Sequence, residues 1–160
     1  MTAQILDRIL TCYRIGDPNG AYPVFDATGS TIAPGRWNTS RSPMIYTSEH
    51  YSTALLEKLV HGSGRMPLNQ HCVTVTIPSG LSYEVFPVAT LPGWDRPIAE
   101  SSKAYGEKWC GEKRSLVAIV PSVVARRDMN FLINPAHAEF KHVSASLHEP
   151  VYWDSRLYGI

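Results

Sequence analysis

An arginine, a tyrosine and a glutamate lie close together in the sequence, between positions 35 and 57. Arg36 is in the segment Gly-Arg-Trp-Asn, Tyr46 in Ile-Tyr-Thr-Ser, and Glu57 in Ala-Leu-Leu-Glu. An arginine can pair bidentately with phosphate, a tyrosine ring can stack on a heteroaromatic base, and a carboxylate can accept hydrogen bonds from ribose hydroxyls. A carboxylate there would also stabilise positive charge developing on a ribosyl carbon. The three groups predict chemistry on NAD, although the sequence has no Rossmann glycine fingerprint.

The composition predicts one globular domain spanning residues 1–160. Hydrophobic residues make up 44% of the chain, charged residues 18%, and the formal net charge is +1. So small a charge, with no basic stripe, predicts no direct binding to nucleic acid or to a membrane surface. The chain does not begin like a signal peptide, and no apolar run approaches the ~20 residues of a membrane span. Three widely separated cysteines argue against a disulfide framework and favour a cytoplasmic location.

Short strands and two or three helices are expected along the chain, in mixed order. Strands are predicted at 11–15, 43–46, 72–77 and 116–120, with further extended segments at 130–135 and 142–153. Within 72–77 the residues Val73, Val75 and Ile77 fall on one face, and residues 21–35 are expected to form a loop. This order predicts an α+β fold with a compact mixed or antiparallel sheet and a few helices.

The helix carrying Glu57 is expected to begin after Ser48, a suitable N-cap residue, and to stop at Gly62 or Gly64. Its apolar stripe consists of Leu55, Leu56, Leu59 and Val60. A second helix is predicted from Ile98 to about Cys110. Trp37, Trp94 and Trp109 are expected in the core or in a pocket wall.

Together, these motifs resemble those of the RES family, in the family's order and over nearly the whole chain. They include Tyr13-Arg14, Gly35-Arg36-Trp37-Asn38, Ile45-Tyr46-Thr47-Ser48, Leu56-Glu57, Trp94, Gly106 with Trp109, Val120-Pro121-Ser122, Asn130, Leu132-Ile133-Asn134-Pro135 with His137, and Asp154-Ser155-Arg156-Leu157. The family is named after an Arg, a Glu and a Ser, which are best matched here by Arg36, Glu57 and Ser122.

The resemblance implies a fold like that of ADP-ribosyltransferase toxins and the role of toxin in a bacterial toxin–antitoxin pair. The implied activity degrades NAD by cleaving the nicotinamide–ribose bond, as an NAD phosphorylase or glycohydrolase with phosphate or water as acceptor. The alternative within the family is ADP-ribosylation of a cellular protein. The resemblance further implies an Xre-type antitoxin as partner and a homodimer. NAD would be the substrate, and no metal is expected.

Roles for five residues follow from this resemblance and from the charges on NAD. Arg14 and Arg36 would neutralise the pyrophosphate, Tyr46 would stack on nicotinamide, and Glu57 would hold the ribose and favour an oxocarbenium-like transition state. Ser122 would hydrogen-bond a phosphate or the incoming nucleophile. One departure from the family pattern is the stretch after Asn38, where Arg41 could contact phosphate or lie in solvent.

Other interpretations of the same residues remain open at this point. Glu57 could be an ordinary helix carboxylate, Arg36 could pair with a structural aspartate, and aromatic residues near Tyr46 and Tyr51 could form the surface of a non-enzymatic protein-binding module. His137-Ala138-Glu139 has the spacing of a zinc deaminase motif, but the required cysteine pair does not follow. The cysteines lie in no recognisable nucleophile motif, so a cysteine hydrolase is not favoured.

Overall fold

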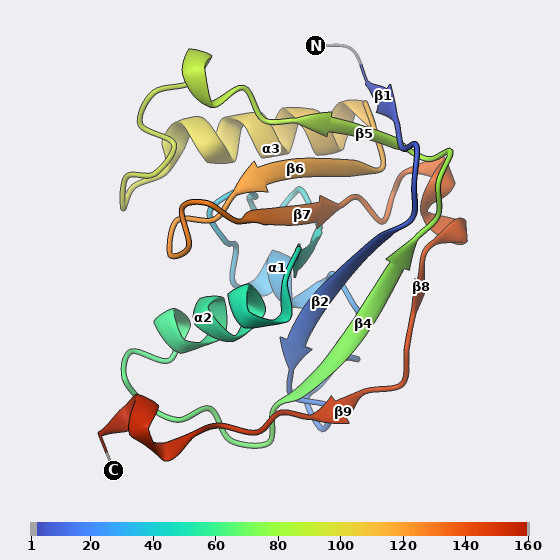
Figure 1. Ribbon diagram of the computed structural model, residues 1–160. Coiled ribbons are helices and arrows are strands. Elements are labelled where there is room, and N and C mark those ends of the chain that lie inside the picture. Colours follow the sequence, from blue (N-terminus) through green and yellow to red (C-terminus); the bar gives the residue numbers. More distant parts are fainter. Residues whose placement is uncertain (1–2, 160) are drawn as a thin grey trace.

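A nine-stranded sheet organises residues 3–159, which the computed structural model describes (Figure 1). The strands are β1 (Gln4–Ile5), β2 (Leu10–Gly16), β3 (Ile45–Ser48), β4 (His71–Ile77), β5 (Ser82–Val85), β6 (Val117–Pro121), β7 (Met129–Ile133), β8 (Ser144–Ala145) and β9 (Glu149–Pro150). Their order is β1-β5-β6-β7-β3-β2-β4-β8, and β9 also pairs with β4. The described pairs are antiparallel except β5 with β6, so the prediction of an α+β fold with a mixed, largely antiparallel sheet is confirmed.

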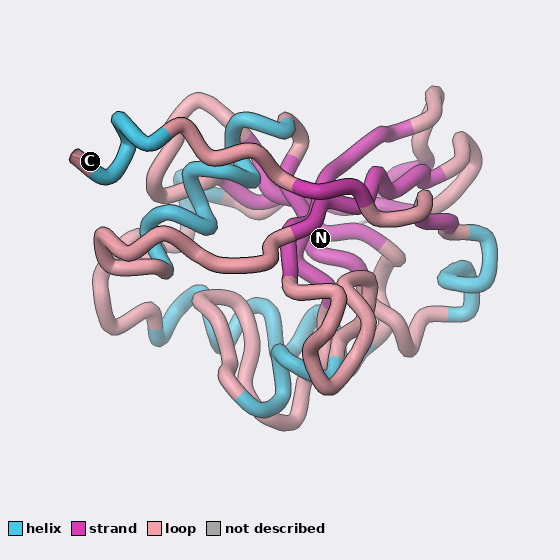
Figure 2. The backbone as a smooth tube through the Cα atoms, turned by 90° about the horizontal axis from the view of Figure 1, so that it is seen from below, coloured by secondary structure: helices cyan, strands magenta, loops and turns pink. Residues whose placement is uncertain are grey.

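Three α-helices and three short 3₁₀ segments complete this sheet. The helices are α1 (Thr28–Ile32), α2 (Tyr51–His61) and α3 (Glu100–Glu112), and the 3₁₀ segments are η1 (Val88–Thr90), η2 (Ala138–His142) and η3 (Ser155–Tyr158). In Figure 1, α3 lies behind β5 and β6, whereas α2 lies below β7 and beside β2. Seen from below, the strands gather together and long loops surround them (Figure 2). None of the described helices is both long and apolar enough to span a membrane.

The sheet separates two hydrophobic cores because alternate residues of its central strands face opposite sides. On β7, Phe131 and Ile133 pack into one core with Val73, Val75 and Ile77 of β4. Leu132, between them, packs into the other core with Met44 and the aromatic side chains contributed by α3 and by the loops before it. Trp37, Trp94 and Trp109 are buried in this second core, as predicted.

Helix α3 touches the backbone of the segment that carries Arg36. A Cβ atom placed on Gly106 would lie 1.7 Å from the carbonyl oxygen of Trp37, so only glycine permits this approach. Lys103, one turn earlier on α3, donates hydrogen bonds to the carbonyls of Gly35 (2.7 Å) and Asn38 (3.2 Å). Helix α3 therefore fixes the position of the Arg36 segment.

Several sequence-based boundaries hold, and others are wrong for identifiable reasons. Strand β4 has the predicted alternation, and α2 ends at His61 with Gly62 as C-cap. The expected loop at 21–35 contains α1. Ser48 is not the N-cap of α2: it belongs to β3, and its hydroxyl donates to Asn130, while His50 occupies the cap position without a side-chain cap bond.

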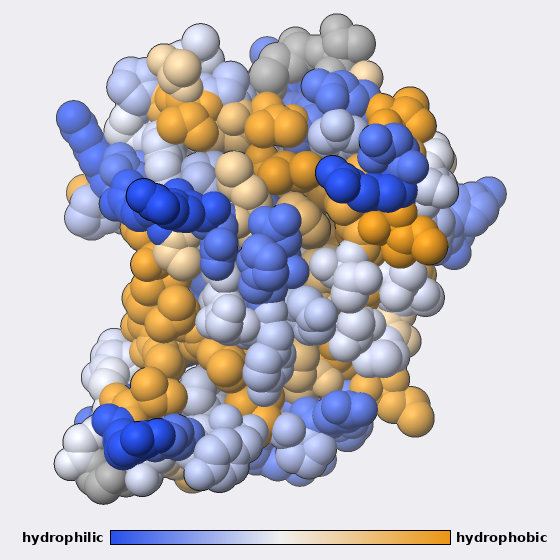
Figure 3. All heavy atoms as spheres, viewed as in Figure 1, coloured by the Kyte–Doolittle hydropathy of each residue, from blue (hydrophilic) through white to orange (hydrophobic). Residues whose placement is uncertain are grey.

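The predicted apolar stripe of α2 is only partly buried. Leu56 and Val60 are 40% and 57% exposed, and the fully buried residues of the helix are Thr53 and Ala54. Hydrophobic side chains gather over α2 at the left of the molecule in Figure 3. The hydrophobic periodicity was correct for a helix, but the polar side chain of Thr53 turns inward because its hydroxyl donates to the carboxylate of Asp128.

Candidate active site

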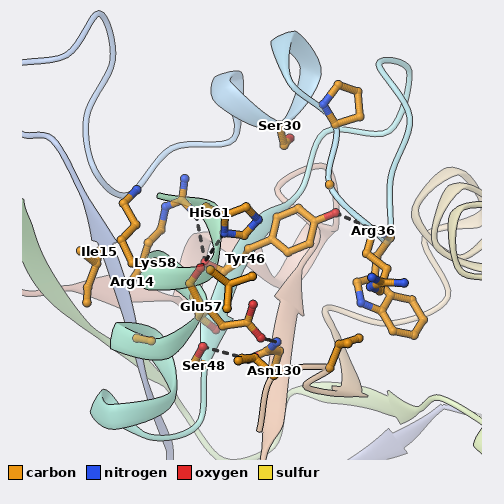
Figure 4. Close-up of a pocket in the computed structure, with 18 of the residues that line it drawn as sticks. Arg14, Ile15, Ser30, Arg36, Tyr46, Ser48, Glu57, Lys58, His61 and Asn130 are labelled. Atoms are coloured by element: carbon orange, nitrogen blue, oxygen red, sulfur yellow. Dashed lines mark hydrogen bonds between the residues drawn. The ribbon is translucent and has the colours of Figure 1, made fainter. Parts of the chain in front are cut away.

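A cavity of about 790 Å³ lies between α2, β3 and the loop that follows α1. This volume is in the range of small-molecule and cofactor sites. Its lining includes four of the five residues singled out from the sequence, namely Arg14, Arg36, Tyr46 and Glu57. Figure 4 shows Tyr46 in the middle, with Arg14 on one side, Arg36 on the other and Glu57 below. The structure thus brings residues from β2, a loop, β3 and α2 to one site.

Glu57 points into the cavity from α2 and is held through one of its two carboxylate oxygens. Its Oε1 accepts hydrogen bonds from the Ser122 hydroxyl and from the side-chain amide of Asn130, both at 2.8 Å. No hydrogen bond from another described residue reaches Oε2. The fixed oxygen orients the carboxylate, and the other remains available to a ligand.

The two donors to Glu57 are placed by the pairing of neighbouring strands. Asn130 lies opposite Ser48 on β3 and opposite Val120 on β6. The Ser48 hydroxyl donates to the side-chain oxygen of Asn130 at 2.8 Å, which directs the amide nitrogen toward Glu57 (Figure 4). Ser122 follows the end of β6, is completely buried, and accepts a hydrogen bond from the backbone N–H of Ala125. This geometry favours a role for Ser122 in holding Glu57 over direct contact with a phosphate.

Tyr46 is tied by its hydroxyl to the Arg36 segment. The hydroxyl donates to the side-chain oxygen of Asn38 (2.7 Å) and accepts from the backbone N–H of Trp37 (3.1 Å). Burial, the largest effect, raises the pKa of Tyr46 far above its ordinary value, so the hydroxyl stays protonated. The buried Asn38 also accepts from the N–H of Gly35. Tyr46 therefore orders the loop while its side chain lines the cavity.

Arg36 keeps most of its hydrogen-bonding capacity for a ligand. One terminal nitrogen, Nη1, donates to the carbonyls of Trp94 (3.0 Å) and Arg96 (2.7 Å). Nε and Nη2 donate to no other described residue, and together they form the edge of a guanidinium that binds an oxyanion bidentately. The loop carbonyls thus orient the guanidinium without neutralising it.

Arg14 is held more completely than Arg36. Its Nε donates to the carbonyl of Val24 (2.6 Å), Nη1 to that of Tyr46 (3.0 Å) and Nη2 to that of Asp26 (3.5 Å). Burial lowers the pKa of Arg14, an effect that the nearby Asp26 opposes. The guanidinium still carries its charge, because arginine is not deprotonated in proteins. Two of its five N–H groups remain unused by these bonds.

Among the lining residues that were given no role from the sequence, three carry a charge or donate to Glu57. Lys58 precedes the exposed turn of α2, Lys103 is on α3, and Asn130 on β7 is the donor described above. Asn130 belonged to the family pattern, but its partnership with Glu57 follows only from strand register. Nothing in the sequence marks the two lysines, and only the folded chain shows that they line the cavity.

Residues outside the cavity clarify the remaining sequence predictions. Arg41 does not line the cavity: its side chain is 81% exposed to solvent and forms an ion pair with Glu107 (2.8 Å). Burial raises the pKa of the Cys12 thiol to about 12, which leaves it unreactive, and burial also raises the pKa of Cys110. Among residues 3–159, no group of three or more His, Cys, Asp or Glu side chains is placed to hold a metal ion.

Comparison with known families places this site in context. The family model of the RES domain matches residues 11–154. The chain belongs to the RES family. Its curated relatives include the Prs ADP-ribosylating toxin of Sphingobium sp. (strain YBL2), 34% identical over 152 residues, covering 91% of this chain and 94% of that protein. Toxin Res of Photorhabdus laumondii is 26% identical over 149 residues, covering 91% of this chain and 95% of that one.

A solved structure shares the architecture of this RES domain. The crystal structure of the M. tuberculosis MbcT–MbcA toxin–antitoxin complex contains a chain that matches with a TM-score of 0.72 and 14% identity. The match covers 97% of this chain and 90% of that one. The match shows that this chain shares its α+β fold with a chain of that complex.

Proposed function

We propose that this RES toxin degrades NAD by cleaving the bond between nicotinamide and ribose. The observation that carries the proposal is the cavity itself, in which one oriented carboxylate, Glu57, lies among the cations Arg14, Arg36, Lys58 and Lys103. A dinucleotide has the complementary charges, because its pyrophosphate is anionic and its nicotinamide ring is cationic. The names of the relatives, which include an ADP-ribosylating toxin, support chemistry on the same bond.

The reaction follows from how charge moves when the bond breaks. The bonding electron pair leaves with the nicotinamide nitrogen, so the ring becomes neutral and positive charge develops on the ribose C1′. The free Oε2 of Glu57 would stabilise that charge and accept hydrogen bonds from ribose hydroxyls. Arg36 would bind the pyrophosphate through its Nε–Nη2 edge, each charge-assisted contact contributing about 1.5–3 kcal/mol. Tyr46 would contact the nicotinamide ring and limit its orientation.

The nucleophile that completes the reaction distinguishes three enzyme classes. Attack of a phosphate oxygen on C1′ gives ADP-ribose 1-phosphate, whereas attack of water gives ADP-ribose and a proton. Attack by a protein side chain would be ADP-ribosylation, a second candidate favoured by the name of the Sphingobium relative. We favour a small acceptor because a cavity of about 790 Å³ is in the range of small-molecule sites.

Incubation of the purified protein with NAD, with and without inorganic phosphate, tests the proposal. Mass spectrometry should detect nicotinamide together with ADP-ribose 1-phosphate or ADP-ribose. Addition of a cell lysate and radiolabelled NAD tests the alternative, which predicts label on a protein band. NAD that persists unchanged in all three mixtures would contradict both activities.

A toxin that consumes NAD must be restrained in its own cell. We propose an Xre-type antitoxin as partner, a cytoplasmic location and a homodimeric state. A toxin–antitoxin complex among the structural relatives supports the first of these. Size-exclusion chromatography with light scattering, with and without the product of a neighbouring helix-turn-helix gene, measures both the oligomeric state and the association.

A further inference from the structure

The cations of the cavity are divided between two ends. In Figure 4, Arg14 and Lys58 lie side by side on one side of Tyr46, and Arg36 lies on the other. Burial, the largest effect, raises the pKa of Tyr46, and the charges of Arg14 and Arg36 both act against that rise. One pyrophosphate at Arg36 would therefore leave the charge of Arg14 and Lys58 uncompensated.

No side chain of residues 3–159 forms an ion pair or a hydrogen bond with the two cations of this second end. Lys58 forms no hydrogen bond or ion pair with any of them, and Arg14 donates only to backbone carbonyls. The charge of Asp26 acts to raise the pKa of Arg14, and the charge of Asp17 acts to raise the pKa of Lys58. The Asp26 carboxylate accepts from the N–H of Thr28, and that of Asp17 from Asn19 and Asn69, so both are engaged elsewhere.

The position of Lys58 is costly for a positive charge. Burial lowers the pKa of its ammonium, and the charge of Arg14 lowers it further. Two neighbouring cations without a carboxylate partner become favourable when an anion binds between them. A rigid guanidinium and an ammonium on a flexible stem together suit a phosphate, because the first sets direction and the second adjusts to it.

We propose that Lys58 and Arg14 form a second anion subsite of the cavity, separate from Arg36, which binds a phosphate group. This proposal rests on the proposed function, and it adds a ligand group that NAD alone does not supply. The phosphate could be free, as the acceptor that attacks ribose, or it could be the 2′-phosphate of NADP. His61 lies at the same end and donates a hydrogen bond through Nδ1 to the carbonyl of Glu57 (2.7 Å). Its Nε2 can therefore accept a hydrogen bond from a protonated oxygen of that phosphate.

The test compares Lys58→Gln with the matched control Lys141→Gln, since Lys141 is exposed on η2 and does not line the cavity. Both changes are made in a Glu57→Gln background, which prevents consumption of the dinucleotide. Thermal-shift titrations with inorganic phosphate, NAD and NADP give three affinities for each variant. We expect Lys58→Gln to weaken phosphate or NADP at least tenfold more than NAD, Lys58→Arg to restore binding, and Lys141→Gln to change none. Weaker binding of inorganic phosphate to Lys58→Gln identifies the ligand of the subsite as the free acceptor. Weaker binding of NADP alone identifies it as the 2′-phosphate of NADP.

Two results would overturn the subsite. If Lys58→Gln weakens NAD as much as NADP and phosphate, Lys58 belongs to the pyrophosphate site. If no affinity changes, no anion binds between Lys58 and Arg14. Failure of the proposed function has a different signature, because the chain with Glu57 intact would then leave NAD uncleaved whatever the titrations show.

Discussion

Asn130 donates a 2.8 Å hydrogen bond to the Oε1 of Glu57, and its own orientation is fixed by the hydroxyl of Ser48. The three residues come from β7, α2 and β3. The helix that carries Glu57 is therefore held by hydrogen bonds to two strands of the sheet. Because the bond from Asn130 uses one oxygen of the carboxylate, the charge and the position of Glu57 can be changed separately.

Loss of the Glu57 charge should abolish NAD degradation without unfolding the protein. In Glu57→Gln the amide oxygen can keep both hydrogen bonds from Ser122 and Asn130, so only the charge facing the cavity is lost. Arg36→Ala removes a partly exposed side chain whose partners are loop carbonyls. We expect each variant to lose about 100-fold or more in turnover, as for other groups that stabilise transition-state charge.

Growth and cellular NAD, measured after induction at equal protein abundance, check this expectation. Arg41→Ala is the control, because Arg41 pairs with Glu107 outside the cavity. Full toxicity from the Glu57→Gln protein would refute the assignment.

Asn130→Asp should impair the enzyme in a pH-dependent way. The substitution keeps the shape of the side chain but replaces a donor with a second carboxylate against Glu57. Two adjacent carboxyl groups cannot both ionise without cost, so one proton shared between them restores a hydrogen bond. We expect a fall in kcat at neutral pH that is partly recovered as the pH is lowered.

The pH dependence of kcat for the wild type, Asn130→Asp and the exposed control Asn19→Asp measures this effect. A purely structural role for Asn130 predicts a parallel loss at every pH. A fall in kcat that does not vary with pH would show that the Asn130 side chain does not control the protonation of Glu57.

The Tyr46 hydroxyl should matter for stability as well as for binding. Tyr46→Phe leaves the N–H of Trp37 without its partner and removes one donor to the buried Asn38. An unsatisfied buried group costs about 1–3 kcal/mol. We expect Tyr46→Phe to lose about that much stability and to raise KM for NAD, and Tyr46→Ala to lose activity as well.

Chemical denaturation and steady-state kinetics of both variants separate the two contributions. Tyr152→Phe is a suitable control, since Tyr152 is 82% exposed. Unchanged stability and KM in Tyr46→Phe would leave ring contact as the sole role of Tyr46.

Part of the candidate site could be predicted from sequence, because an arginine, a tyrosine and a glutamate are group types that binding of a dinucleotide would need. Arg36, Tyr46 and Glu57 fit a dinucleotide, and the structure places them around one cavity. Burial of β4 also followed from its alternation. The role of Asn130 could not be predicted, since it depends on which residue of β3 lies opposite it. Ser48 was misassigned as a helix cap because a serine before a helix looks the same whether its hydroxyl turns toward the helix or across the sheet.

Gly106→Ala should disrupt the site from a distance. The added methyl group would meet the backbone carbonyl of Trp37, which cannot move without displacing Arg36. We expect a loss of more than about 3 kcal/mol of stability, larger than the typical effect of a point mutation. Gly111→Ala on the same helix is the control, because nothing lies within 4 Å of its new Cβ atom, and it should be neutral or slightly stabilising. Equal stability of the two variants, measured by thermal unfolding, would contradict the tight packing.

The mouth of the cavity should also be where an antitoxin binds. Val60 and Val124 line the cavity and are 57% and 36% exposed, and Ile98 beside the lining residue Pro97 is 78% exposed. An apolar rim around an electropositive interior suits a partner that inserts an acidic segment. We therefore predict that NAD and the antitoxin compete, and that Arg36→Ala weakens antitoxin binding by about tenfold while Arg41→Ala does not. Titration of the antitoxin into the Glu57→Gln toxin, with and without saturating NAD, measures the competition. A ternary complex with unchanged affinity for NAD would mean that inhibition acts from another surface.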